Sequence, residues 1–138
     1  MAGRGKGGIL VMSSLSGFWG SPYVVVYGAT KAFLLTLAEG LSKELGDKGV
    51  SVTVCAAGPI LTPNYIASKP PGSGPSAIEM TPEAVARAAL AGLGRKPLVV
   101  PGGLNKFARF LMGRVMSRKA ATRMLGNSTG KMYDKAMR

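Results

Sequence analysis

The chain has 138 residues, of which 46% are hydrophobic, and this length and composition are typical of one globular domain. It contains no histidine, the commonest catalytic base and metal ligand, so a Ser-His-Asp triad is excluded and a zinc site is not expected. Any chemistry must therefore come from tyrosine, lysine or serine, or from a cofactor. The formal net charge of +12 is concentrated near the C-terminus, where eleven lysines and arginines follow from Arg95 onward against a single acid, Asp134.

We predict neither a secretory signal nor a membrane span. The apolar run Ile9-Leu10-Val11-Met12 behind the basic N-terminus is only about four residues long, which is too short for a signal peptide. No segment approaches the roughly 18 to 20 apolar residues that a transmembrane helix needs. The single cysteine, Cys55, is expected to be a buried strand thiol rather than a nucleophile. We therefore expect a cytoplasmic protein, with the basic tail as the feature that would bring it to a membrane surface.

The first part of the chain is predicted to alternate strand, helix and strand. Residues 8–13 indicate a short buried strand, and Ser21-Pro22 resembles an N-cap followed by a proline in the first helical turn. From about 22 to 47, apolar residues at spacings of three and four predict a helix. Residues 50–56 are apolar almost throughout, as in a parallel strand covered on both faces. This order predicts a βαβ unit with a right-handed crossover.

The second part of the chain begins with a predicted surface loop at residues 62–80, which has five prolines and glycines between Pro70 and Pro75. The loop is either a plain linker or, as we favour, a lid over a substrate. It follows the C-terminal end of a strand, where ligands of open α/β sheets bind. A helix at 81–93 and a short strand at 98–100 come next, and 104–138 is predicted to form two or three short helices with basic faces.

Tyr27 and Lys31 are the strongest candidates for chemistry. They are four residues apart in the predicted helix, so their side chains share one face. An ammonium beside a phenol favours the phenolate and lowers a tyrosine pKa that is ordinarily near 10. Ser14 lies thirteen residues upstream of Tyr27, at the end of the first predicted strand. Together the hydroxyl, phenol and ammonium predict a device for moving a proton to or from an alcohol or carbonyl oxygen.

These residues resemble the short-chain dehydrogenase/reductase family. The match consists of Ser14, then Tyr27-x-x-x-Lys31, then Gly58-x-x-x-Thr62 after the following strand. The resemblance implies an α/β fold, namely the C-terminal half of a Rossmann-type doubly wound parallel sheet of about three strands, with C-terminal helices added.

The resemblance divides the chain into a catalytic half at 1–103 and a basic helical extension at 104–138. The family's glycine-rich pyrophosphate turn, cofactor-selecting residue and catalytic asparagine are not found in the sequence. The glycines at 3–8 precede the first predicted strand, whereas the fingerprint follows a strand. We therefore expect a fragment whose sheet has an open apolar edge. Such an edge would aggregate, dimerise, or dock onto a partner that supplies the other half.

The resemblance also implies roles for single residues. Tyr27 gives or takes the proton at the substrate oxygen, Ser14 hydrogen-bonds the same oxygen, and Lys31 lowers the tyrosine pKa and bonds the nicotinamide ribose. The reaction is hydride transfer between NADP or NAD and a carbonyl or secondary alcohol of a small-molecule substrate, and no metal is implied. A homo-oligomer through the tyrosine helix is also implied. The expected cofactor-binding residues are Tyr27, Lys31, Gly58, Pro59, Ile60 and Thr62.

The alternative is a non-catalytic module that acts through its basic tail. The cations of the tail together with Phe107, Phe110, Leu111 and Met112 would form an amphipathic helix on an anionic membrane or against a partner. No specific nucleic-acid binding is expected, because no aromatic stacking platform or base-reading motif is present. For the tail itself we favour helices whose cationic face is solvated and whose apolar face packs against the rest of the chain.

Overall fold

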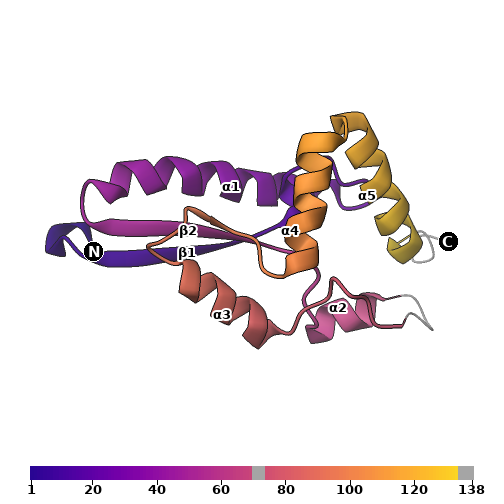
Figure 1. The fold of residues 1–138 in the computed structure, drawn as a ribbon, viewed down its shortest axis with the longest axis horizontal. Coiled ribbons are helices and arrows are strands. Elements are labelled where there is room, and N and C mark those ends of the chain that lie inside the picture. The colour runs from indigo at the N-terminus through magenta and orange to yellow at the C-terminus, as the bar shows by residue number, and fades with distance from the viewer. Residues whose placement is uncertain (70–73, 134–138) are drawn as a thin grey trace.

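The computed structural model describes residues 1–69 and 74–133. Its three strands are parallel and lie in the order β1-β2-β3 (Figure 1). The central strand β2 (Val50–Ala57) pairs over its whole length with β1 (Gly7–Ser14) and over two residues with β3 (Leu98–Val99). The predicted α/β architecture with a three-stranded parallel sheet is thereby confirmed.

Helices cover both faces of the sheet. The crossover helix α1 (Val25–Gly46) lies on one side and α3 (Pro82–Gly92) lies on the other (Figure 1). Because successive strand residues face opposite ways, β2 supplies apolar side chains to both helices, which explains its unbroken apolar sequence. Toward α1 the buried core contains Val52, Val54 and Ala56 with Leu35 and Ala38, and toward α3 it contains Cys55 and Ala57 with Val85 and Ala89.

The predicted start of the long helix is wrong. The helix begins at Val25, and Val24 occupies the N-cap position without a side-chain capping bond. The hydroxyl of Ser21, which was expected to cap the helix, donates instead to the Ser16 carbonyl at 3.2 Å. Tyr23 then adopts a left-handed φ of +67°, which no α-helix contains. The consecutive valines around the start are poor helix formers and do not extend the helix toward Ser21.

Two short 3-10 turns flank the first strand. One turn, η1 (Ala2–Arg4), precedes β1, and the other, η2 (Leu15–Gly17), follows it directly. The predicted start of the next helix is confirmed, because the Thr81 hydroxyl accepts the Ala84 amide at 3.2 Å and so caps α3.

The described parts of the stretch at 62–80, residues 62–69 and 74–80, contain more regular structure than a plain surface loop. The stretch includes a short helix, α2 (Pro63–Ser68). Its two ends are also joined, since the Met80 amide donates to the Pro59 carbonyl at 3.1 Å and the Leu61 amide donates to the Met80 carbonyl at 2.9 Å. The stretch therefore leaves the sheet and returns to the same point.

A carboxylate ties the stretch together from within. Glu79 accepts hydrogen bonds from the Lys69 ammonium and the Tyr65 hydroxyl, both at 2.8 Å, and from the Ser76 amide at 3.1 Å. These donors, the Lys69 side chain first among them, lower the Glu79 pKa from 4.5 to about 2. Of the proline- and glycine-rich segment between Pro70 and Pro75, residues 70–73 lie outside the described residues.

The C-terminal part of the chain is helical, as predicted. It consists of α4 (Gly103–Phe110), a turn of π-helix η3 (Leu111–Val115) and α5 (Arg118–Tyr133), while 134–138 lie outside the described residues. Figure 1 shows α4 and α5 at the end of the sheet where the strands point. Among the described residues, no helix has the length and apolar character needed to cross a bilayer.

The expected packing of the apolar side of this tail is wrong in part. Met112 is buried, but Phe107 is 61% exposed and Phe110 is 58% exposed. Both rings lie on the side of α4 that no other described element covers. Contact of this face with an anionic membrane stays a prediction.

Candidate active site

Ser14 ends the first strand at the edge where the expected site residues gather. The register of the parallel pair places Ser14 opposite Ala57, one residue before Gly58. The strand pairing therefore brings Ser14 beside the start of the Gly58-x-x-x-Thr62 motif. The Ser14 hydroxyl accepts the Ser16 amide at 3.2 Å, and this bond caps the turn η2.

Tyr27 and Lys31 occupy the first two turns of α1 and lie against each other. The Lys31 ammonium nitrogen is 5.5 Å from the centroid of the Tyr27 ring. The same ammonium donates to the Met12 carbonyl of β1 at 3.1 Å, which directs the lysine toward the sheet. Tyr27 is 48% exposed, so its phenol is open to a ligand. Within the described residues, no hydrogen bond joins Ser14 to either side chain.

The turn after β1 is fixed to α1 by a close backbone contact. A Cβ on Gly17 would lie 2.8 to 2.9 Å from backbone atoms of Lys31 and Ala32, closer than real contacts allow. The buried Ser13 hydroxyl donates to the Lys31 carbonyl at 2.8 Å. Gly17 and Ser13 therefore set the distance between the serine motif and the tyrosine helix. Sequence reasoning missed both roles, although the glycine in a tight turn was a usable signal.

The expected cofactor segment leaves polar groups available. Among the residues that the structure describes, nothing pairs with the Ile60 N–H, because the bonds that close the neighbouring loop use Pro59, Leu61 and Met80. The Thr62 hydroxyl accepts the Tyr65 amide at 3.3 Å and caps α2, which leaves its own proton free to donate. These donors follow the carboxyl end of β2.

Asn105 is a buried polar residue at this edge that sequence reasoning missed. It is 2% exposed, and its amide nitrogen donates to the Ile78 carbonyl at 3.1 Å. Its Oδ1 is buried without a hydrogen-bond partner in the described part of the chain. A Cβ on Gly58 would lie 2.6 Å from this oxygen, so only glycine lets the strand end approach α4 so closely. Gly58, the first residue of the expected cofactor segment, therefore packs directly against Asn105.

Cys55 belongs to the buried cluster against which Ile60 packs. It is fully buried on the α3 side of β2, and burial raises the pKa of its thiol from 9.0 to about 11. The thiol stays protonated at neutral pH, and its expected place inside a strand is confirmed.

Comparison with known proteins shows which family the chain belongs to. The family model for short chain dehydrogenases matches residues 1–70. A 7beta-hydroxysteroid dehydrogenase from Clostridium sardiniense is 31% identical over 131 residues, which cover 95% of this chain and 48% of that protein. Another, from Collinsella aerofaciens, is 35% identical over 108 residues, which cover 76% of this chain and 41% of that protein. The chain therefore belongs to the short-chain dehydrogenase family, and it spans about half the length of these curated relatives.

Solved structures show the same fold. A 7beta-hydroxysteroid dehydrogenase structure is similar with a TM-score of 0.81 at 29% identity, covering 90% of this chain and 49% of that chain. A short chain dehydrogenase from Burkholderia cenocepacia in complex with NADP is similar with a TM-score of 0.70 at 25% identity, covering 87% and 47%. The predicted half of a Rossmann-type sheet is thus confirmed.

Proposed function

We propose that this chain is the catalytic half of a nicotinamide-dependent oxidoreductase that acts on a carbonyl or secondary alcohol. The observation that carries the proposal is the contact between the Lys31 ammonium and the Tyr27 ring at the carboxyl edge of the sheet. When bound, the nicotinamide supplies or accepts the hydride. The proton and the placement of the substrate oxygen come from the chain itself.

Tyr27 is the general acid and base of this proposal. Its exposed phenol donates a proton to a carbonyl oxygen during reduction and takes it back during oxidation. The Lys31 cation beside the ring stabilises the phenolate that remains after donation. Ser14, at the end of β1, supplies the hydroxyl that holds the substrate oxygen. The Ser14 oxygen accepts the Ser16 amide, so the hydroxyl proton is free to be donated to the substrate.

The donor groups at this edge fit the nicotinamide end of the cofactor. The Ile60 N–H and the Thr62 hydroxyl suit a carboxamide, which offers one acceptor oxygen and an amino group. The Lys31 ammonium donates one of its three N–H bonds to the Met12 carbonyl, so two N–H bonds remain for ribose hydroxyls. Relatives of similar fold were solved with NADP and with NADPH, the two redox states of one cofactor, which supports a nicotinamide cofactor, NADP or NAD, for this chain.

We propose a bulky secondary alcohol or ketone, such as a hydroxysteroid, as the substrate class. The support comes from the relatives, several of which are 7beta-hydroxysteroid dehydrogenases. The stretch at 62–80 returns to the sheet beside Ile60, so it lies where a lid over such a substrate would be needed.

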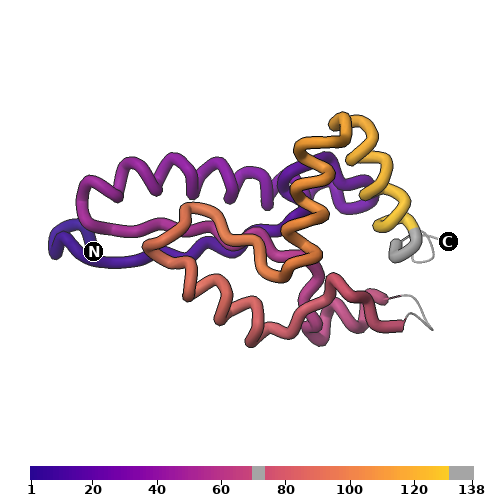
Figure 2. The backbone as a smooth tube through the Cα atoms, in the orientation of Figure 1, coloured from indigo at the N-terminus to yellow at the C-terminus, as the bar shows by residue number. Residues whose placement is uncertain are grey.

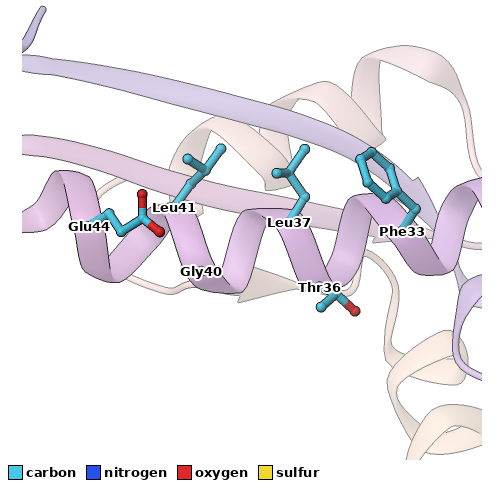
Figure 3. Close-up of a pocket in the computed structure, with 6 residues that line it drawn as sticks. All are labelled: Phe33, Thr36, Leu37, Gly40, Leu41 and Glu44. Carbon is cyan, nitrogen blue, oxygen red and sulfur yellow. The ribbon is translucent and has the colours of Figure 1, made fainter.

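We also propose that a second copy of the chain covers the outer face of α1. Val26 is 77% exposed and Phe33 is 63% exposed on this face. A shallow groove of about 230 Å³ continues along the helix, and its apolar side chains project from one side (Figure 3). Sedimentation of Phe33→Asp should show a smaller species than the unmodified chain. The groove is lined by Phe33, Thr36, Leu37, Gly40, Leu41 and Glu44.

The catalytic proposal is tested by steady-state turnover of the chain joined to the cofactor-binding half of the Clostridium sardiniense relative. Tyr27→Phe removes only the phenolic oxygen and should abolish turnover while the melting temperature is retained. Ser42→Ala removes a hydroxyl from the same helix, farther from the site, and should leave turnover unchanged. Turnover of Tyr27→Phe equal to that of Ser42→Ala would contradict the proposal.

A further inference from the structure

We propose that α5 clamps the loop before α1, residues 18–24, and that Thr129 on α5 is a positioning residue for Tyr27. The inference rests on the proposed role of Tyr27 and deepens it. It starts from the beginning of α1, where Tyr27 is only the third residue. No side chain caps this helix, so the place of its first turn depends on whatever holds the preceding loop.

The loop itself contains a conformation that needs support. Tyr23 has a φ of +67°, a left-handed value that tyrosine rarely adopts. Its side chain is 51% exposed, so core burial does not hold it there. A residue in such a conformation persists when surrounding contacts over-determine it. The contacts around Tyr23 therefore decide how firmly the start of α1 is fixed.

The helix α5 supplies these contacts from more than a hundred residues away. Figure 2 shows the yellow helix beside the violet loop that leads into α1. The Thr129 hydroxyl oxygen lies 2.8 Å from the Pro22 carbonyl oxygen. A Cβ on Gly126 would lie 3.0 Å from Pro22, and one on Gly130 would lie 3.1 Å from the Tyr23 ring. Two glycines four residues apart thus let this face of α5 reach the loop.

The single proton of the Thr129 hydroxyl has three carbonyls within reach, of which the Gly126 carbonyl is the farthest at 3.5 Å. Its oxygen is 2.8 Å from Pro22 and also 2.8 Å from Leu125 within α5. The Leu125 carbonyl already accepts the Thr129 amide in the helical ladder. The Pro22 carbonyl accepts no other hydrogen bond from the described residues. Donation to Pro22 therefore satisfies a carbonyl that would otherwise be unpaired, and this favours the bond between the helix and the loop.

The rest of the C-terminal segment continues the contact toward β1. The Arg109 guanidinium lies 4.8 Å from the centroid of the Phe18 ring. A Cβ on Gly113 would lie 3.5 Å from Trp19, the only tryptophan of the chain. The fluorescence of Trp19 therefore reports on the contact between the C-terminal segment and the loop.

The test measures amide hydrogen exchange and Trp19 fluorescence on the chain itself. Thr129→Val keeps the branched shape and removes the hydroxyl. Exchange at the Gly28 amide, which donates to the Val24 carbonyl at 2.8 Å, should become about fivefold faster, as expected for one lost hydrogen bond. Thr129→Ser should restore the slow exchange. Ser128→Ala removes an exposed hydroxyl from the same helix and should leave the exchange unchanged.

A second variant separates the clamp from helix stability. Gly126→Ala strengthens an α-helix by propensity but places a methyl group against Pro22. The clamp predicts faster exchange at Gly28 and a shifted Trp19 emission, with the Val54 amide of β2 unchanged. Unchanged exchange at Gly28 in both Gly126→Ala and Thr129→Val would overturn the inference.

Turnover of the joined enzyme links the clamp to the proposed role of Tyr27. Thr129→Val should lower kcat about fivefold with KM nearly unchanged, and Thr129→Ser should restore it. A normal kcat in Thr129→Val together with an inactive Tyr27→Phe would overturn the clamp alone. Turnover retained in Tyr27→Phe would instead overturn the proposed function.

Discussion

The βαβ unit and the C-terminal segment are held in different ways. The strands and α1 bury apolar side chains on both faces of the sheet, with Val54 and Ala38 almost completely covered. The segment from α4 to α5 leaves Phe107 and Phe110 exposed. It meets the loop before α1 through a few side chains and glycines, namely Arg109, Gly113, Gly126, Thr129 and Gly130. The comparison shows that burial of apolar side chains fixes the strands and α1, which carry the site residues. The position of the loop before α1 depends instead on a few specific contacts.

The largest expected loss of stability comes from the buried side of α1. Leu35 is 7% exposed within the core between α1 and β2. Leu35→Ala should lower the free energy of unfolding by about 2 to 5 kcal/mol, because it removes buried methyl groups and leaves a cavity. Urea denaturation followed by circular dichroism measures this loss. A loss below that of a surface substitution would contradict the assignment of the core.

Gly17→Ala tests the contact between η2 and α1. The added methyl group meets the backbone of Lys31 and Ala32, which cannot rotate away as a side chain can. We expect a loss of about 1 to 3 kcal/mol in the free energy of unfolding, as for other overpacked contacts. Gly46→Ala at the end of α1, where a Cβ meets nothing within 4 Å, is the matched control and should not destabilise the chain. Equal stability of the two variants would show that η2 does not pack as described.

Glu79→Gln tests the carboxylate that closes the stretch at 62–80. The Glu79 pKa is about 2 in the folded chain and 4.5 ordinarily, so its contribution to stability is fully present above pH 4.5 and is lost as the pH falls toward 2. The unmodified chain should therefore melt at a higher temperature than Glu79→Gln at neutral pH. This difference should shrink between pH 4.5 and pH 2. A difference that does not depend on pH would contradict the ionised carboxylate.

The smallest effect is expected on the exposed face of α4. Phe107→Ala should change the free energy of unfolding by no more than about 0.5 kcal/mol, because the ring is 61% exposed. Thermal melting beside Leu35→Ala gives the comparison directly. A loss as large as that of Leu35→Ala would mean that the ring is covered in solution.

The sequence was sufficient for the features that depend on local pattern. The apolar run of β2, the period of α1 and the Thr81 cap each follow from neighbouring residues, and the structure has all three. The start of α1 was mispredicted because Ser21 is buried and bonds to Ser16, and because Tyr23, with its left-handed backbone, separates Ser21 from the helix.

The features that were missed depend on contacts between distant parts of the chain. Asn105 meets Ile78 across 27 residues, and Thr129 meets Pro22 across 107. No spacing rule predicts such pairs, since they arise only when the sheet and the helices are assembled. The family motif placed Tyr27 and Lys31 on one helix face, but it carried no information about which segment holds that helix in place.

The central claim is that the Tyr27 phenol exchanges a proton with the substrate oxygen. The most direct test is the single-turnover rate of hydride transfer in the joined enzyme, followed by the absorbance of the reduced nicotinamide. Tyr27→Phe should slow this step by about 10²- to 10⁴-fold, the range of general acid and base catalysis. A rate within about twofold of the unmodified enzyme would contradict the claim, because a contribution from the phenol must exceed that factor.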